Sequence, residues 1–148
     1  MVEQLDFDHV DVGHELCPLR LTLTGEQVAR YAHAARLQAG RFMSDDGARR
    51  EGLPGQIAPG NMSLALFSRL IGQSFPGMRL RHLSATFRVP LQPRQRITVR
   101  GVVTEKHVSD QGSFLDCDLV LESEEGERWV TGTARVALPP PCTAASRG

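Results

Sequence analysis

The sequence predicts an α+β domain in which a curved antiparallel β-sheet wraps around one long central helix. Three observations support this prediction. Four stretches in the second half of the chain alternate apolar and polar residues at the period of a strand, and short polar turns join them. The segment from about Asn61 to Gly72, NMSLALFSRLIG, is apolar around most of a helical circumference. With 148 residues, the chain has the length of a single domain, so these elements should share one core.

The composition is that of an ordinary soluble globular chain, with 41% apolar and 23% charged residues. Lys+Arg and Asp+Glu both number 17, so the charge balance does not indicate a nucleic-acid partner. The N-terminus is acidic and no apolar run reaches the length of a membrane span, so we expect neither a secretory signal nor membrane association. The three cysteines are widely spaced, which argues against a disulfide framework or a metal site. We therefore expect a cytoplasmic protein that needs no metal and no other cofactor.

The C-terminal end differs in composition from the rest of the chain. Residues 139–148 read PPPCTAASRG and show no apolar period, which predicts a disordered Pro-rich tail. The folded domain should therefore occupy residues 1–138.

The first predicted elements are a short strand and a helix. Leucines alternate along residues 16–23, which indicates a half-buried strand. Thr24 and Gln27 form a capping-box pattern, so a helix should run from Gly25 to about Gln38. The buried stripe of this helix is expected to be Val28, Tyr31, Ala32 and Ala35.

Two further segments lie between this helix and the predicted strands. Residues 39–60 hold five glycines and two prolines, which predicts an irregular segment that crosses the face of the sheet. One helical turn, from Asp45 to Arg50, is expected within it. The apolar central helix follows directly.

The predicted strands each have one apolar face. Their connections are short, polar and rich in turn-forming residues, so neighbouring strands should be antiparallel. The expected inward residues are Leu83, Ala85, Phe87 and Val89; Ile97, Val99, Gly101 and Val103; Leu115, Cys117, Leu119 and Leu121; and Val130, Gly132, Ala134, Val136 and Leu138.

The apolar faces of these strands must be buried, and the segment 61–72 is the strongly apolar helix available to pack against them. An antiparallel sheet curved around one buried helix is the hot-dog fold. A five-stranded sheet of this kind leaves an open edge, and an unpaired edge favours pairing with another chain. We therefore expect at least a dimer, either a homodimer or a heterodimer with another hot-dog chain.

Five segments, in this order, resemble the MaoC-like hydratases and dehydratases: FDHVDVGHEL, TGEQVARYAHA, GLPGQIAPG, LRHLSATFRVPLQP and VTGTARVALP. The resemblance covers roughly residues 7–138. It implies the hot-dog fold and a ligand that is an acyl thioester of coenzyme A or of acyl carrier protein. It also implies chemistry in which water is added to, or removed from, the carbon–carbon double bond beside the thioester.

The catalytic motif of that family, Asp-x-Asn-Pro-x-His, is missing. An ungapped count back from the Gly-Leu-Pro-Gly run places Leu37 at the aspartate and Phe42 at the histidine, with Ala39 and Gly40 between them. Neither Leu nor Phe can transfer a proton, and residues 34–52 contain no histidine. The catalytic residues of the family therefore do not carry over to this chain.

The loop that enters the central helix does carry over. The resemblance implies that backbone N–H groups around Gly60 point toward the thioester carbonyl, where the helix N-terminus adds partial positive charge. Its implied substrate-binding residues are Gln56, Ala58, Pro59 and Gly60. The alternative for Gly60 is a purely structural role at the end of a turn. Asn61 would supply an amide to the ligand or, in the interpretation we favour, form the N-cap of the helix.

Four side chains are candidates for catalysis in place of the missing motif: Asn61, Asp45, Asp46 and Glu51. A thioesterase needs only a polarised carbonyl and one carboxylate or amide that positions water, so any of the four would suffice. The alternative for Asp45 and Asp46 is that they only complement the dipole of a helical turn.

Three functions follow from these residues. The first, which the sequence favours slightly, is thioester hydrolysis. The second is a non-catalytic subunit that pairs with an intact MaoC-like chain. The third is a dehydratase or isomerase with a rewired site, working in specialised biosynthesis.

Overall fold

The computed structural model describes residues 7–110 and 112–138, so the tail expected at 139–148 lies outside the described residues. A five-stranded antiparallel sheet in the order β1-β3-β4-β5-β2 forms the centre of the molecule. Its strands are β1 (Leu19–Thr22), β2 (Arg79–Phe87), β3 (Arg96–His107), β4 (Ser113–Ser123) and β5 (Arg128–Leu138). The helices are the 3-10 turn Phe7–His9, α1 (Gly25–Ala34), α2 (Gly40–Met43), α3 (Asp45–Arg50) and α4 (Gly60–Ser74).

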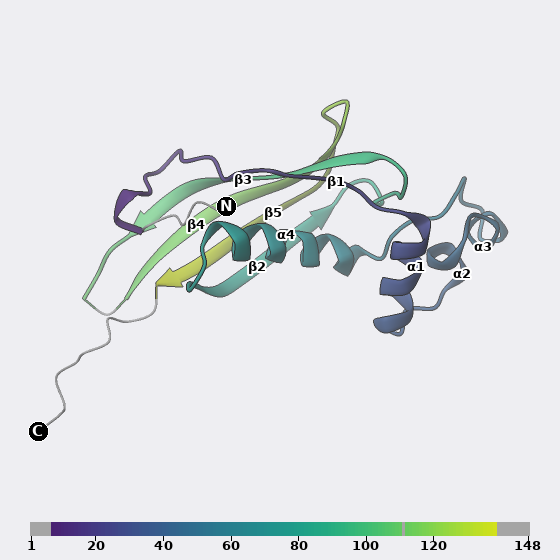
Figure 1. The fold of residues 1–148 in the computed structure, drawn as a ribbon, viewed down its shortest axis with the longest axis horizontal. Coiled ribbons are helices and arrows are strands. Elements are labelled where there is room, and N and C mark those ends of the chain that lie inside the picture. Colours follow the sequence, from purple (N-terminus) through teal and green to yellow (C-terminus); the bar gives the residue numbers. More distant parts are fainter. Residues whose placement is uncertain (1–6, 111, 139–148) are drawn as a thin grey trace, which may run out of the picture.

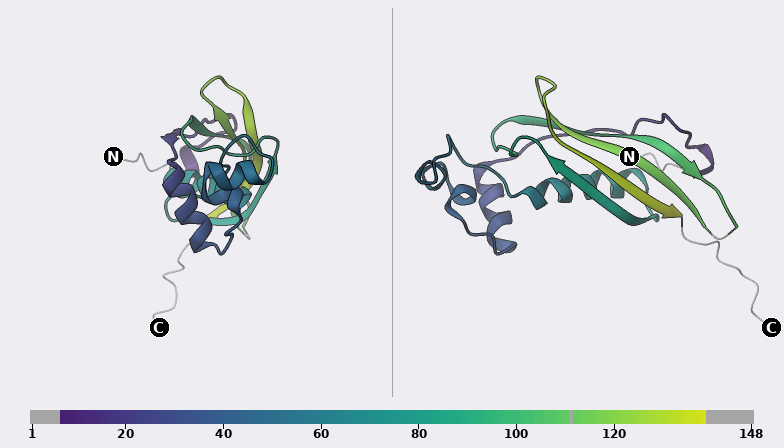
Figure 2. Two further views of the ribbon diagram at one scale, coloured as in Figure 1. Left: turned by 90° about the vertical axis from the view of Figure 1, so that its right-hand side faces the viewer. Right: turned by 180° about the vertical axis from the view of Figure 1, so that it is seen from behind.

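The sheet curves around α4, as the sequence predicts (Figure 1). The three shorter helices α1, α2 and α3 gather beyond one end of the sheet, an arrangement that is also clear from behind (Figure 2). Among the described residues, none of the helices combines the length and apolarity that crossing a membrane requires.

The core lies between α4 and the inner face of the sheet. Phe67 and Leu70 of α4 are fully buried, and so is Val99 of β3. Gly132 of β5 makes this close packing possible, because a Cβ there would meet the ring of Phe67 and the carbonyl oxygen of Ser84. The inward residues predicted for β3, β4 and β5 are buried, apart from the partly exposed Gly132 and Leu138.

The ends of two helices differ from the sequence-based prediction. The helix α1 ends at Ala34 rather than near Gln38, because Arg36 adopts a left-handed backbone conformation with φ of 59°. Ala35 consequently lies outside the helix and is exposed, so its predicted place in the buried stripe is wrong. The capping box of Thr24 with Gln27 is confirmed. The central helix continues two residues past Gly72.

Candidate functional site

The first turn of α4 is the feature that the sequence analysis singles out for ligand binding. The helix begins at Gly60 with Pro59 as its N-cap, and no side chain caps the turn. The prediction that Asn61 is the N-cap is therefore wrong. Asn61 lies inside the first turn and is exposed. An uncapped first turn leaves backbone N–H groups available to a ligand oxygen.

The loop that leads into this turn is held by two backbone hydrogen bonds. The N–H of Ala58 donates to the carbonyl of Leu91 over 2.7 Å, and the N–H of Ile57 donates to the carbonyl of Arg41 over 3.0 Å. Ala58 and Pro59 are buried, whereas Gly60 is exposed. The predicted binding residues Ala58 and Pro59 are thus buried beneath the surface and support the first turn of α4 structurally.

Phe87, the last residue of β2, forms a wall beside the turn. A Cβ placed on Gly60 would lie 3.2 Å from the ring of Phe87, which is closer than ordinary contact. Phe87 is 51% exposed. Gly60 does not have a positive φ, so a side chain at this position would press on the ring of Phe87 and would not strain the backbone.

A cavity of about 400 Å³ runs along α4 between β1 and α1. Its walls include Leu21 and Leu23 of the β1 segment, Tyr31 of α1, and Met62 and Leu66 of α4. These side chains are mostly apolar, and Gln27 with Arg69 supplies polar groups. The cavity therefore suits an apolar chain that extends from the first turn of α4.

A larger cavity of about 700 Å³ lies across the outer face of the sheet. Arg20, Arg100 and Asp118 are among its charged lining residues, and threonines of β2 and β5 add hydroxyl groups. The inward-facing residues of the same strands cover α4, so this cavity is separated from the first turn of α4 by the sheet. We place the candidate site at the smaller cavity because it adjoins α4.

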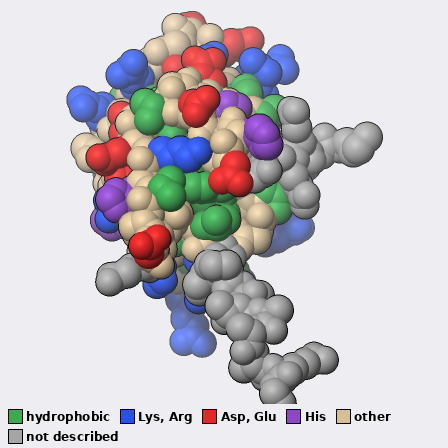
Figure 3. All heavy atoms as spheres, turned by 90° about the vertical axis from the view of Figure 1, so that its left-hand side faces the viewer, with side chains coloured by type: hydrophobic (Ala, Val, Ile, Leu, Met, Phe, Trp, Pro, Cys, Tyr) green, Lys and Arg blue, Asp and Glu red, His purple; other side chains and the backbone are tan. Residues whose placement is uncertain are grey.

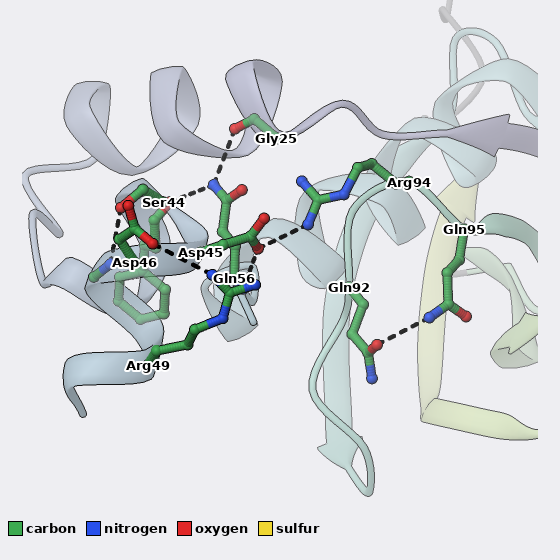
Figure 4. A network of polar contacts seen from close by, with 11 residues as sticks. Gly25, Ser44, Asp45, Asp46, Arg49, Gln56, Gln92, Arg94 and Gln95 are labelled. Atoms are coloured by element: carbon green, nitrogen blue, oxygen red, sulfur yellow. Dashed lines mark hydrogen bonds and ion pairs between the residues drawn. The ribbon is translucent and has the colours of Figure 1, made fainter. Parts of the chain in front are cut away.

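Asp45 and Gln56 belong to a hydrogen-bond network that holds together the helical segment, which consists of α1, α2 and α3 (Figure 4). The Oδ1 atom of Asp45 accepts hydrogen bonds from the backbone N–H of Gln56 over 2.9 Å and from the Arg94 guanidinium over 2.8 Å. These two donors, the Gln56 N–H foremost, hold the pKa of Asp45 below its usual value. The buried Gln56 side chain donates to the carbonyls of Gly25 and Phe42 over 3.0 and 2.8 Å.

The other two acidic candidates are also engaged in local contacts. Asp46 pairs with Arg49 on the same helical turn over 3.3 Å. Glu51 accepts a hydrogen bond from the backbone N–H of Arg41 over 2.9 Å and forms an ion pair with its guanidinium. The acidic candidates and Gln56 thus have partners within the helical segment and the loop after β2, while Gly60 and Asn61 lie on α4.

No protein-family model and no curated protein matches the chain. Solved structures do match it. The (R)-hydratase of A. caviae involved in PHA biosynthesis superimposes with a TM-score of 0.79 at 22% identity, over 88% of this chain and 98% of that chain. The ChsH1-ChsH2 complex from Mycobacterium tuberculosis gives 0.77 at 19% identity, over 87% and 98%. The C-terminally truncated HadBC (3R-hydroxyacyl-ACP dehydratase) complex from Mycobacterium tuberculosis gives 0.72 at 14%, over 91% and 99%.

The chain has the hot-dog fold of the MaoC-like dehydratases and R-hydratases. The predicted fold class is confirmed, and the family resemblance is confirmed at the level of the fold.

The hot-dog chain carries no acid–base pair at the two expected motif positions. Leu37 is a partly exposed residue after α1, and Phe42 is buried in α2 with the Arg41 guanidinium 4.6 Å above its ring. The backbone carbonyl of Phe42 accepts one of the Gln56 hydrogen bonds. Phe42, which occupies the expected histidine position, therefore contributes to the packing of the helical segment.

Two parts of this site were missed by the sequence analysis. The apolar cavity joins β1, α1 and α4, and although Leu21, Tyr31 and Met62 were each predicted to be buried, nothing in their spacing brings them together. The wall formed by Phe87 was missed for a similar reason, because Phe87 was assigned only to the inner face of a strand. Among the described residues, no cluster of three or more His, Cys, Asp or Glu side chains is arranged to hold a metal ion.

Proposed function

We propose that this chain is an acyl-thioester-binding subunit that lacks a hydratase acid–base pair and works beside a second hot-dog chain. The observation that carries the proposal is the combination of an uncapped first turn of α4 with an apolar cavity along the same helix. The thioester carbonyl would accept hydrogen bonds at Gly60, where the partial positive charge of the helix N-terminus favours it. The acyl chain would lie in the cavity along α4. The carrier would be coenzyme A or acyl carrier protein.

The state of the acidic residues supports a binding role over catalysis by this chain alone. A general base needs a free lone pair and a pKa near the working pH. Asp45 uses Oδ1 for two hydrogen bonds and has a lowered pKa, which makes it a weaker base. Asp46 and Glu51 form ion pairs of their own. Asn61, exposed in the first turn of α4, remains the candidate through which thioester hydrolysis would occur.

The similar structures support a role beside a second chain. Two of them are complexes, ChsH1-ChsH2 and HadBC. A hot-dog chain that keeps the helix-entry loop and has lost the whole motif fits one half of such a pair. The other chain would then supply the acid and the base.

The test uses the purified chain with butyryl-CoA and crotonyl-CoA, a saturated and a 2-enoyl thioester. Calorimetry measures binding, a thiol reagent measures hydrolysis, and enoyl absorbance measures hydration. We expect saturable binding of both thioesters with neither thiol release nor loss of enoyl absorbance. Thiol release at an enzymatic rate would instead assign hydrolysis to the chain. Absence of binding to either thioester would overturn the proposal.

A further inference from the structure

The apolar cavity along α4 has a single charge in its wall. Of the described residues that line it, Arg69 of α4 alone is charged. No acid is close to Arg69 in the sequence, because there is no Asp or Glu between Gly52 and Thr104, so neither α4 nor β2 contains one. By contrast, the end of the molecule opposite α1–α3 mixes acidic, basic and histidine side chains (Figure 3).

Arg69 has no acidic partner from other parts of the fold either. Within residues 7–110 and 112–138, ion pairs with Asp or Glu are formed by other arginines, namely Arg30, Arg41, Arg49, Arg94, Arg100 and Arg135. Arg69 forms no ion pair within the same residues. Glu26, the acid of α1, lies 3.5 Å from Arg30 on the exposed side of that helix. The N–H donors of the Arg69 guanidinium are therefore available to a ligand.

Gln27 of α1 adds further hydrogen-bond donors to the same cavity. Its Oε1 atom accepts a hydrogen bond from the Thr24 backbone N–H over 2.8 Å as part of the capping box. The Nε2 amide group of Gln27, which can only donate, remains for a ligand. Apart from the hydroxyl groups of Thr22 and Tyr31, the rest of the wall is apolar. The cavity thus combines apolar walls with donors that match an anionic, acceptor-only group such as a carboxylate.

The position of Arg69 on α4 sets the length of chain that would reach it. Gly60 and Arg69 are nine residues apart, which corresponds to about 13.5 Å along the helix axis. An arginine side chain extends several ångströms from its Cα, and helical side chains lean toward the N-terminus. An extended hydrocarbon chain advances about 1.3 Å per carbon, so roughly eight carbons cover the remaining distance from a carbonyl at Gly60.

We propose, resting on the thioester binding proposed above, that the acyl group ends in a second carboxylate and that Arg69 binds this carboxylate. The ligand class is the monothioester of a medium-length α,ω-dicarboxylic acid. The planar guanidinium matches a carboxylate with two parallel hydrogen bonds. In an apolar cavity without this arginine, the carboxylate would lose its hydration without compensation. Arg69 therefore favours a chain that ends in a carboxylate over one that ends in a methyl group.

The test compares thioesters that differ only at the last carbon, which is a carboxylate in suberoyl-CoA and a methyl group in octanoyl-CoA. Calorimetry with the wild-type chain should give an affinity about fivefold higher for suberoyl-CoA. This preference should shrink at about 0.5 M salt, because part of the guanidinium is exposed. Succinyl-CoA and butyryl-CoA form the corresponding short pair, and succinyl-CoA should gain no such preference because its carboxylate does not reach Arg69.

Substitutions of Arg69 assign the preference to its side chain. Arg69→Gln should weaken suberoyl-CoA binding about fivefold and change octanoyl-CoA binding by no more than about twofold. Arg69→Lys keeps the positive charge without the planar fork and should keep part of the preference. The matched control is Arg50→Gln, which removes an exposed arginine of α3 outside the cavity wall and should leave both affinities as in wild type. Thermal unfolding reports the fold of each variant.

The inference is overturned if wild type binds suberoyl-CoA no more tightly than octanoyl-CoA. It is also overturned if Arg69→Gln weakens both thioesters equally, since Arg69 would then contact the coenzyme A part that they share. A preference that survives Arg69→Gln, or that is equally large for succinyl-CoA over butyryl-CoA, would place the carboxylate elsewhere and would overturn it too. In each of these cases the proposed thioester binding still stands, whereas absence of binding to every thioester would overturn both proposals.

Discussion

Gly60 is the residue at which the end of β2 meets the start of α4. The Phe87 ring occupies the direction in which a side chain at position 60 would point. Because Gly60 has no positive φ, a larger residue there meets the ring without backbone strain. A substitution at this residue therefore tests the site with little effect on the fold.

We expect Gly60→Val to weaken acyl-thioester binding at least about tenfold and to leave the protein folded. The branched side chain would fill the space beside the N–H groups, and loss of one hydrogen bond there would cost about 1.5 kcal/mol, which corresponds to about tenfold in affinity. Calorimetry with butyryl-CoA measures the affinity, and thermal unfolding reports the fold.

Asn61→Ala is the companion variant. Because Asn61 is not a cap, its loss should change stability by no more than about 0.5 kcal/mol. If its amide binds the ligand, affinity falls. A folded Gly60→Val protein with unchanged affinity would remove this loop from the site.

Asp45 is a carboxylate with a structural role, because it accepts hydrogen bonds from Gln56 and Arg94. Its folded-state pKa is lowered, so the stability that its contacts provide is present above the unfolded pKa of about 3.9 and is lost as pH falls through the lower folded pKa. Asp45→Asn should therefore unfold at a lower temperature than wild type at pH 7, and the difference should close in strong acid.

The control for Asp45 is Asp46→Asn, which removes the neighbouring acid, whose pair with Arg49 is exposed. Thermal unfolding of the three proteins between neutral and strongly acidic pH provides the comparison. A difference between Asp45→Asn and wild type that persists unchanged in strong acid would mean that the carboxylate charge is not the cause.

At the scale of elements, one glycine of the sheet and one glycine of α4 have different surroundings. Gly132 of β5 lies beneath the ring of Phe67, with the Ser84 carbonyl close by. Gly72 is exposed in α4, and a Cβ there would meet nothing within 4 Å. Substitutions at these two glycines therefore distinguish the cost of overpacking from the effect of helix propensity.

We expect Gly132→Ala to destabilise the protein by about 1–3 kcal/mol, because the added methyl forces β2, β5 and α4 apart. Gly72→Ala should stabilise it by about 0.5–1 kcal/mol, since alanine is the better helix former and the site is open. Urea unfolding of both variants measures the two free energies. Equal shifts of the same sign would show that the packing around Phe67 does not set the cost.

At the scale of the whole molecule, the open edge and the candidate site share a residue. Phe87 ends β2 and also forms the wall beside Gly60. The shape of the candidate site therefore depends on how the end of β2 packs against the start of α4.

We expect the chain alone not to hydrate crotonyl-CoA, because Leu37 and Phe42 occupy the motif positions and neither transfers a proton. Enoyl absorbance measures the rate, with an R-hydratase as positive control. Turnover on the order of 10 per second, typical of enzymes, would mean that the ungapped motif alignment is wrong.

The sequence by itself determined the strands, the central helix and the face that each one turns inward. Alternation along β3 places Val99 and Val103 inward, and the capping box at Thr24 begins α1, because both depend on residues that are neighbours in the chain. The absence of the catalytic motif could also be recognised from the sequence, because it depends only on which residue types occupy the motif positions.

Only the tertiary structure decided the contacts that define the site. Asp45 meets Arg94, 49 residues away, and Gln56 reaches Gly25, 31 residues away, so neither pairing leaves a local pattern. The start of α4 at Gly60 also follows the anchoring of its entry loop by Leu91 and Arg41, which made the N-cap assignment of Asn61 wrong. The exposure of β2 is likewise tertiary, because alternation says which face turns inward and cannot say how far α4 covers it.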